Sequence, residues 1–321
     1  MRVTRLLDRP IIDAATCPSI GTNIQGPSLV RRPDWLEAPG RYLLYFADHK
    51  GGHIRLAWAD EVTGPWTVHR PGSLQLANSH FSTKPPAATD AEIEMLRDRY
   101  RKHLGSEASI DDVLIDATTP HIASPDVHAD HENRRLVMYF HGLERLGVQL
   151  TRVATSTDGI HFVAQPELLG PSYFRCFRHR NWWYALAMPG RLLRSRDGLE
   201  DFEAGPVLFE PRMRHSAVAR RGDRLDVVWS RAGDAPESLL HSTIDLAGDW
   251  STWRDEFVGE VLRPERPWEG AGRPVEPSRR GAVHGLVNQL RDPCLLVEQD
   301  HTWLLYAVGG ESGIGVASVD W

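Results

Sequence analysis

The sequence predicts an all-β fold, a β-propeller of five blades in a single domain spanning residues 1–321. The prediction rests on a strand pattern that recurs five times, on the spacing of the recurrences, and on a last copy that is one strand short. The aromatic-rich strand of the pattern occurs as GRYLLYFADHKG (40–51), NRRLVMYFHGL (133–143), RNWWYALAMPG (180–190), DRLDVVWSRAG (223–233) and HTWLLYAVGGE (301–311). Repeats of this kind indicate an architecture of stacked or ring-arranged units.

An apolar strand precedes each aromatic-rich strand. The five preceding strands are GPSLVRR (26–32), SPDVHAD (124–130), GPSYFRCF (170–177), HSAVARR (215–221) and DPCLLVE (292–298). The second, third and fourth of them begin about 46 and about 45 residues apart, which is the length of a four-stranded propeller blade. Asp-Gly and Thr-Gly-Pro turns follow several of the copies, as tight connections between antiparallel strands require.

Ring closure is predicted at the N-terminus. The last repeat stops at Trp321 after three strands, so we expect the N-terminal MRVTRLL to supply the fourth. Two longer intervals indicate insertions, at about residues 73–118 and 254–288. The first, between blades 1 and 2, contains DAEIEMLRDRYRKHLG, whose apolar side chains recur at helical spacing and predict one amphipathic helix. The second is rich in Pro, Gly and Arg, and a long ordered loop in a compact domain is usually functional.

Composition excludes several classes of partner. The formal net charge is −6, the pI is near 6.2, and no block of Lys or Arg exceeds two residues, so we expect neither nucleic acid nor a membrane as partner. The three cysteines show no CxxC spacing and the 15 histidines show no HExxH pair, so no metal site and no cofactor are predicted. The N-terminus does not resemble a signal peptide, and we expect a cytoplasmic protein. Composition leaves the oligomeric state open.

Several stretches together resemble a known family. They are NIQGPSLV, YLLYFADHKGGHIRLAWADEVTGPWTV, SPDVHADHENRRLVMYFHG, TSTDGIHF and RDPCLLVEQDHTWLLYAVGG, and they are similar to the five-bladed β-propeller glycoside hydrolases of the family 43 and family 32 type. The resemblance covers most of residues 20–319 and implies a divergent member that cleaves a glycosidic bond of a small saccharide or a side-chain sugar. It implies a site on the central axis, where the innermost strand of each blade begins, and it allows a calcium or other ion there.

Three carboxylates are the catalytic candidates. The resemblance implies that Asp292, at the start of an inner strand, or Asp126 is the base or nucleophile of such a site. Asp126 opens another inner strand two residues past the position that matches Asp292, and it faces the same side if the strand is regular. Glu269 lies in the second insertion and is expected to donate the proton. Glycoside cleavage needs one carboxylic acid and one carboxylate roughly 5 to 10 Å apart, and crowding drives their pKa values apart.

The predicted substrate-binding residues lie near the strand openings and in the second insertion. They are Asn23, Asp48, His49, His128, Arg175, His215, Trp268, Glu276 and Arg291. An Arg can hold an acid ionised or bind a substrate carboxylate. An aromatic side chain such as Trp268 can hold a sugar ring.

Two positions depart from the family pattern. The first repeat opens without an Asp, at Asn23 to Pro27, and the third opens without a Glu, at GPSYFRCF. Three arrangements therefore remain open. The catalytic groups are redistributed to Asp126, Glu269 and Asp292, or His215 replaces the Glu as acid, or the protein is a catalytically inactive carbohydrate-binding propeller.

Overall fold

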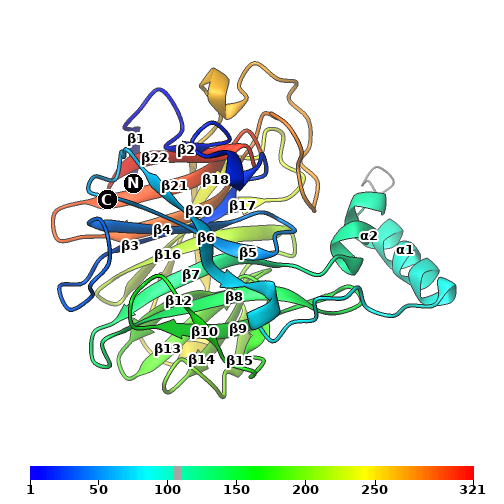
Figure 1. Ribbon diagram of the computed structural model, residues 1–321, viewed down its shortest axis with the longest axis horizontal. Helices are drawn as coiled ribbons and strands as arrows, with labels where there is room; N and C mark the ends of the chain where they lie inside the picture. The colour runs from blue at the N-terminus through cyan, green and yellow to red at the C-terminus, as the bar shows by residue number, and fades with distance from the viewer. Residues whose placement is uncertain (105–109) are drawn as a thin grey trace.

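Five four-stranded blades surround a central axis in the computed structural model, which describes residues 1–104 and 110–321 (Figure 1). Blade 1 contains β3 (Gln25–Arg31), β4 (Tyr42–Ala47), β5 (His53–Ala59) and β6 (Thr67–Gln75). Blade 2 contains β7 (Ile122–Asp130), β8 (Arg135–Arg145), β9 (Val148–Ser156) and β10 (Val163–Ala164), with β11 (Gly170–Pro171) also paired to β9. Both blades are antiparallel throughout, and each begins at the axis and ends at the outside.

The remaining blades repeat this order. Blade 3 contains β12 (Arg175–His179), β13 (Trp182–Ala187), β14 (Arg191–Ser195) and β15 (Glu203–Val207). Blade 4 contains β16 (Met213–Arg221), β17 (Arg224–Arg231), β18 (Leu239–Asp245) and β19 (Asp255–Leu262). Blade 5 contains β20 (Leu290–Val297), β21 (Thr302–Val308), β22 (Gly313–Asp320) and β1 (Arg2–Arg5). The predicted five-bladed propeller is therefore confirmed.

The N-terminal strand closes the ring as the sequence predicts. Strand β1 pairs antiparallel with β22, from Arg2 opposite Asp320 to Arg5 opposite Ala317. The short β2 (Ile12–Asp13) pairs with the other end of β22. The last blade therefore combines both ends of the chain, and the two termini lie close together in Figure 1.

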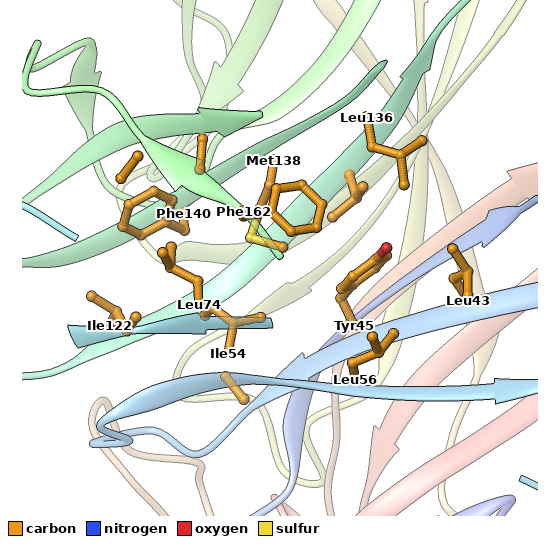
Figure 2. Close-up of a cluster of buried hydrophobic side chains, with 14 of the residues drawn as sticks. Leu43, Tyr45, Ile54, Leu56, Leu74, Ile122, Leu136, Met138, Phe140 and Phe162 are labelled. Carbon is orange, nitrogen blue, oxygen red and sulfur yellow. The ribbon is translucent and has the colours of Figure 1, made fainter. Parts of the chain in front are cut away.

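The core consists of apolar clusters between neighbouring blades. Figure 2 shows the cluster between blades 1 and 2, where side chains of β4, β5 and β6 meet those of β7 and β8. Its labelled members are Leu43, Tyr45, Ile54, Leu56, Leu74, Ile122, Leu136, Met138, Phe140 and Phe162, all buried. Each such side chain contributes about 1.5–3 kcal/mol by leaving water. Because both faces of a blade are covered in this way, the strands are apolar on both sides, and packing keeps the inner strands in place around the axis.

The first insertion forms two helices, α1 (Asp90–Leu104) and α2 (Ile110–Thr118), where the sequence predicted one. Thr89 and Glu92 form a capping box at the start of α1, because each side chain accepts a hydrogen bond from the backbone N–H of the other. Residues 105–109, which fall within the predicted insertion, lie outside the described residues. The pair projects from one side of the blades (Figure 1). None of the helices in the described ranges is long and apolar enough to cross a membrane.

The second insertion is shorter than predicted. Residues 255–262, assigned to the insertion from sequence, form β19, the outer strand of blade 4. The prediction failed because β19 lies at the outside of its blade and most of its side chains are exposed or half-buried, so it lacks the apolar pattern of an inner strand. The irregular segment begins at residue 263 and includes the short 3-10 helix η4 (Pro267–Glu269).

Four of the five inner strands, β3, β7, β16 and β20, are irregular where they begin. The pairing register shifts between Gln25 and Ser28, between Ala123 and Asp126, between Met213 and Ser216, and between Arg291 and Cys294. Positive φ angles occur at Gly26 (61°), Ser124 (50°), Tyr173 (63°) and Asp292 (45°). Glycine is required at position 26, because a Cβ there would lie 3.1 Å from Cα of Ser124. A bulge turns the side chains on its two sides in different directions, so these four strand openings can point side chains at the axis.

Ring closure depends on one buried carboxylate. Glu269 accepts hydrogen bonds from Arg5 Nε (2.8 Å) and from the Tyr306 hydroxyl (3.0 Å), and it is fully buried. We expect Glu269→Ala to lower the free energy of unfolding by about 3–5 kcal/mol, because it removes the buried partner of Arg5 and the buried acceptor of the Tyr306 hydroxyl, leaving Arg5 only the exposed Glu265. Urea titration followed by circular dichroism measures this.

The matched control is Glu265→Ala, since Glu265 also pairs with Arg5, at 2.8 Å, but is exposed. That change should cost about 1 kcal/mol or less. Equal losses in the two variants would show that the buried carboxylate does not hold the closing strand in place.

Candidate functional site

A cavity of about 400 Å³ lies at the end of the axis where the inner strands begin. Its walls come from four parts of the chain: the openings of β12 and β16, loops between second and third strands, both helices of the first insertion, and the end of the second insertion. The lining residues are His49, Arg99, Tyr100, Asp116, Ala117, Gly147, Val148, Gln149, Ser172, Tyr173, Met188, Arg214, His215, Arg280 and Gly281. Because α1 and α2 form part of the wall, the first insertion covers one side of this axial cavity.

Asp292 and His215 form a buried pair directly beneath this cavity. Oδ1 of Asp292 lies 2.8 Å from Nδ1 of His215, and both side chains are almost completely buried. The contact is bent, so within the described part of the chain neither carboxylate oxygen accepts a hydrogen bond. Burial raises the pKa of Asp292, but the contact with His215 and the charge of Arg214 outweigh it and hold that pKa below its ordinary value.

His215 is neutral near pH 7. Burial lowers its pKa, and the nearby Asp292 charge only partly offsets this effect. Its Nδ1 is buried beside the carboxylate while the ring lines the cavity, so Nε2 is the nitrogen available to a bound molecule. A neutral imidazole with a carboxylate behind it has the arrangement of a general base.

His49 is the charged counterpart of His215 in the same cavity. Its Nδ1 lies 3.2 Å from Glu311, and its Nε2 lies 3.4 Å from Asp116 of α2. Burial lowers the pKa of His49, but the charges and hydrogen bonds of Glu311 and Asp116 outweigh it and raise the pKa to about 10. The Asn23 side chain fixes the position of this group, because its carbonyl oxygen accepts from the His49 backbone N–H (2.8 Å) and its amide donates to Glu311 (2.6 Å).

Two arginines and two glutamates form the layer under the cavity. Arg291 is fully buried; its Nη1 lies 3.3 Å from Glu311 and its Nε lies 3.2 Å from Glu237. Arg214 donates to Glu237 at 3.1 Å, and Ser230 donates to the other oxygen of the same carboxylate at 2.7 Å. Each charge in this network therefore has an opposite charge beside it, as buried ions require.

An aromatic stack lines the side of the axis nearest blades 2 to 4. The Tyr173 ring lies between His141, at a centroid distance of 4.4 Å, and His215, at 4.9 Å. Burial lowers the pKa of His141 well below its ordinary value, so this histidine is also neutral. The stack keeps the His215 ring in one orientation relative to the cavity.

Three of the predicted site residues lie at the other end of the axis. Asp126, His128 and Arg175 line a second cavity, of about 460 Å³, together with later residues of the inner strands. Asp126 accepts from the Cys176 backbone N–H (2.7 Å) and lies 2.8 Å from Nε2 of His128. The expectation that Asp126 shares the orientation of the strand opening assumed a regular strand, and the bulge between Ala123 and Asp126 makes that assumption wrong.

Arg175 joins three blades at the axis. Its guanidinium donates to the backbone carbonyls of Ser216 (2.9 Å) in blade 4 and Pro125 (3.3 Å) in blade 2. Its Nη2 is buried and has no hydrogen-bond partner in the described residues. Arg175 therefore links the inner strands of blades 2, 3 and 4.

Four other predicted residues are not among those that line the first cavity. Glu269 is bound to Arg5 and Tyr306 in blade 5, away from the predicted axial site. Trp268 packs against the apolar cluster between blades 4 and 5, and Glu276 is exposed. Asp48 lies 3.3 Å from Arg55.

Sequence reasoning missed five residues that line or support the cavity: Asp116, Arg214, Glu237, Arg280 and Glu311. Four of them precede a strand or follow one in an irregular segment, or lie in the insertions, where pattern analysis has least power. Arg214 could have been predicted from the sequence, because it is adjacent to the predicted site residue His215. Glu311 could also have been predicted, because it is an acidic residue directly after the paired glycines that end the fifth aromatic-rich strand. No cluster of metal-ligating side chains suited to an ion occurs in residues 1–104 and 110–321.

Several solved structures similar to this chain are described as glycoside hydrolases. A family 43 β-xylosidase/α-arabinofuranosidase from a compost microbial metagenome, in complex with xylotriose, has a TM-score of 0.60 at 10% identity, covering 99% of this chain and 95% of that one. A glycoside hydrolase from Parabacteroides distasonis, itself described as putative, has a TM-score of 0.61 at 12% identity over 99% and 96%. The GH43_1 enzyme of Xanthomonas citri with xylotriose has 0.58 at 11% over 97% and 89%. The fold is therefore the five-bladed propeller of family 43.

Comparison of sequences identifies the family of the chain. No protein-family model matches it. Uncharacterized protein R118 of Acanthamoeba polyphaga mimivirus is 32% identical over 323 residues, which cover 92% of this chain and 83% of that protein. The chain belongs to the same family as this viral protein.

The charged state of His49 should appear in the stability of the protein. A histidine with a raised pKa in the folded state stabilises fully below its unfolded pKa, near 6.5, and loses that contribution as the pH rises toward about 10. We therefore expect the stability advantage of the native protein over His49→Gln to shrink between pH 6.5 and 10. The slope should approach one proton, about 1.4 kcal/mol per pH unit.

Urea titrations of both proteins at several pH values measure this difference. Subtracting the free energy of unfolding of one protein from that of the other, at each pH, removes the contributions of the titratable groups that both proteins share. A difference that stays constant from pH 6.5 to 10 would show that His49 is not held in its charged form by Glu311 and Asp116.

Proposed function

We propose that the chain is a glycoside hydrolase-like enzyme that cleaves a glycosidic bond in the cavity at the start of the inner strands. The observation that carries the proposal is the pair of histidines in this cavity whose surroundings move their pKa values in opposite directions, one neutral above a buried aspartate and one charged between two carboxylates. Opposed pKa values of this kind assign the base and the acid of a site. The shared fold of family 43 supports the reaction class.

His215 acts as the base in this proposal. Nε2 takes a proton from a water molecule whose oxygen forms the new bond to the anomeric carbon. Asp292 acts through His215 as a positioning residue, because its carboxylate beside Nδ1 favours the tautomer that leaves Nε2 free to accept. Asp292 thus keeps the place that the family resemblance implies, with the imidazole between it and the substrate.

His49 acts as the acid. As the glycosidic C–O bond breaks, Nε2 of His49 gives its proton to the leaving oxygen, and the long contact to Asp116, 3.4 Å, opens to allow this. Glu311 stays beside Nδ1 and stabilises the charged ring before the transfer. The carboxylates act here by setting the protonation of the imidazoles.

Replacement of the base should abolish turnover. We expect His215→Asn and Asp292→Asn each to lower kcat by about 10²–10⁴-fold on a glycoside that the native protein cleaves, because each removes part of the base. Asp292→Asn should also move the acidic limb of the pH–rate profile to lower pH. The Asp292 charge raises the pKa of His215, so its removal lowers that pKa and leaves a weaker base.

Release of reducing ends from a panel of polysaccharides and aryl glycosides measures turnover, and circular dichroism melting confirms that the variants fold. The matched control is Asp126→Asn, an aspartate of another inner strand that lies at the other end of the axis with a side chain 13% exposed, and it should keep activity within a few fold. If Asp126→Asn abolished turnover instead, the reaction would belong to the second cavity. Sugar binding without reducing-end release would identify a carbohydrate-binding propeller that lacks catalysis.

A further inference from the structure

We propose that the saccharide bound in the cavity at the start of the inner strands carries an anionic group, and that Arg280 binds this group. The anionic group is a uronate carboxylate or a sulfate or phosphate ester. The inference names the substrate class of the site and rests on the proposed function for the reaction that follows binding. It is carried by the charges that line the cavity and by the contacts of one arginine.

The cavity wall has an excess of positive charge. Four lining side chains are cationic, His49, Arg99, Arg214 and Arg280, and among the described lining residues only Asp116 is anionic. Asp116 is already matched, because Lys50 lies 3.0 Å from one of its oxygens and His49 lies 3.4 Å from the other. The wall therefore presents cations to whatever occupies the cavity.

Two of the carboxylates beneath the wall are matched as well, whereas Asp292 lies beside the neutral His215. Glu311 lies beside His49 and Arg291, and Glu237 lies beside Arg214 and Arg291. This layer neutralises Arg214 and His49 from below. It offers no carboxylate within 4.0 Å to Arg280.

Arg280 is the cation of this wall that the described residues leave uncompensated. Its Nη2 donates to the carbonyl of Pro211 at 2.7 Å, and its Nη1 contacts the sulfur of Met188 at 3.8 Å. No carboxylate of the described chain pairs with it. Burial lowers the pKa of Arg280, and the like charge of Arg214 lowers it further. An anion between the two guanidiniums would relieve both effects.

Guanidinium groups suit this task. Their planar arrangement of N–H donors matches the oxygens of a carboxylate, sulfate or phosphate, and such charge-assisted hydrogen bonds are about twice as strong as neutral ones. A neutral sugar would leave Arg280 in a half-enclosed cavity without a carboxylate partner among the described residues. The second insertion, which carries Arg280, thus decides which sugars enter.

Binding of monosaccharides to the full chain tests the inference directly. Isothermal titration with D-galacturonate, D-galactose 6-sulfate, D-galactose 6-phosphate and D-galactose should show at least one anionic sugar binding about tenfold or more tighter than D-galactose. Arg280→Met should remove this preference and leave the affinity for D-galactose unchanged. Arg280→Lys, which keeps the charge but loses the planar donors, should keep part of it.

The matched control is Arg279→Met, at the neighbouring exposed position, which should keep the full preference. Which anionic sugar binds distinguishes a uronate from a sulfate or phosphate ester. Equal or tighter binding of D-galactose, no binding of any anionic sugar, or a preference that survives Arg280→Met would each overturn the inference. The titration measures binding and does not depend on turnover. If the protein prefers anionic sugars but releases no reducing ends, the proposed hydrolysis is contradicted and the inference about the anionic group stands.

Discussion

The structure around the axis depends on the neutralisation of buried charge. Arg291 is completely buried where the inner strands converge, and it lies between Glu237 and Glu311. An unpaired ion at such a position costs several kcal/mol, so the two glutamates must be held close to it. Because Glu237 precedes β18 and Glu311 follows β21, this requirement ties the loops of blades 4 and 5 to one guanidinium. The floor of the cavity follows from that arrangement.

The same charges set the protonation of the cavity wall. Glu311 is shared between Arg291 and His49, so the charge that stabilises the arginine also keeps the imidazole protonated. Among the residues that the structure describes, only His215 lies within ion-pair distance of Asp292, and burial keeps that ring neutral. His49 and His215 line the same cavity but differ in charge, because different carboxylates lie beside them.

Irregular backbone determines which side chains reach this end. The bulges at the strand openings place Asp292 beneath one cavity and turn Asp126 toward the other, although both aspartates lie at the start of an inner strand. Positive φ at Ser124 and Asp292 is costly for residues other than glycine. Such strain is commonly found where a fold is built around a functional site. Packing between the blades supplies the stability that tolerates it.

The sequence by itself determined the five blades, the closing N-terminal strand and α1, because each of these elements has a local sequence pattern of strand, turn or helical spacing. It also indicated His49, His215 and Asp292, which stand at the ends of those patterns. Tertiary structure alone decided which of the predicted residues meet. Glu269 serves ring closure and Asp126 faces the opposite cavity, whereas Glu311 and Arg280 reach the axis from irregular segments. Periodicity carries no information on such segments, because their course is fixed by contacts with residues distant in the chain.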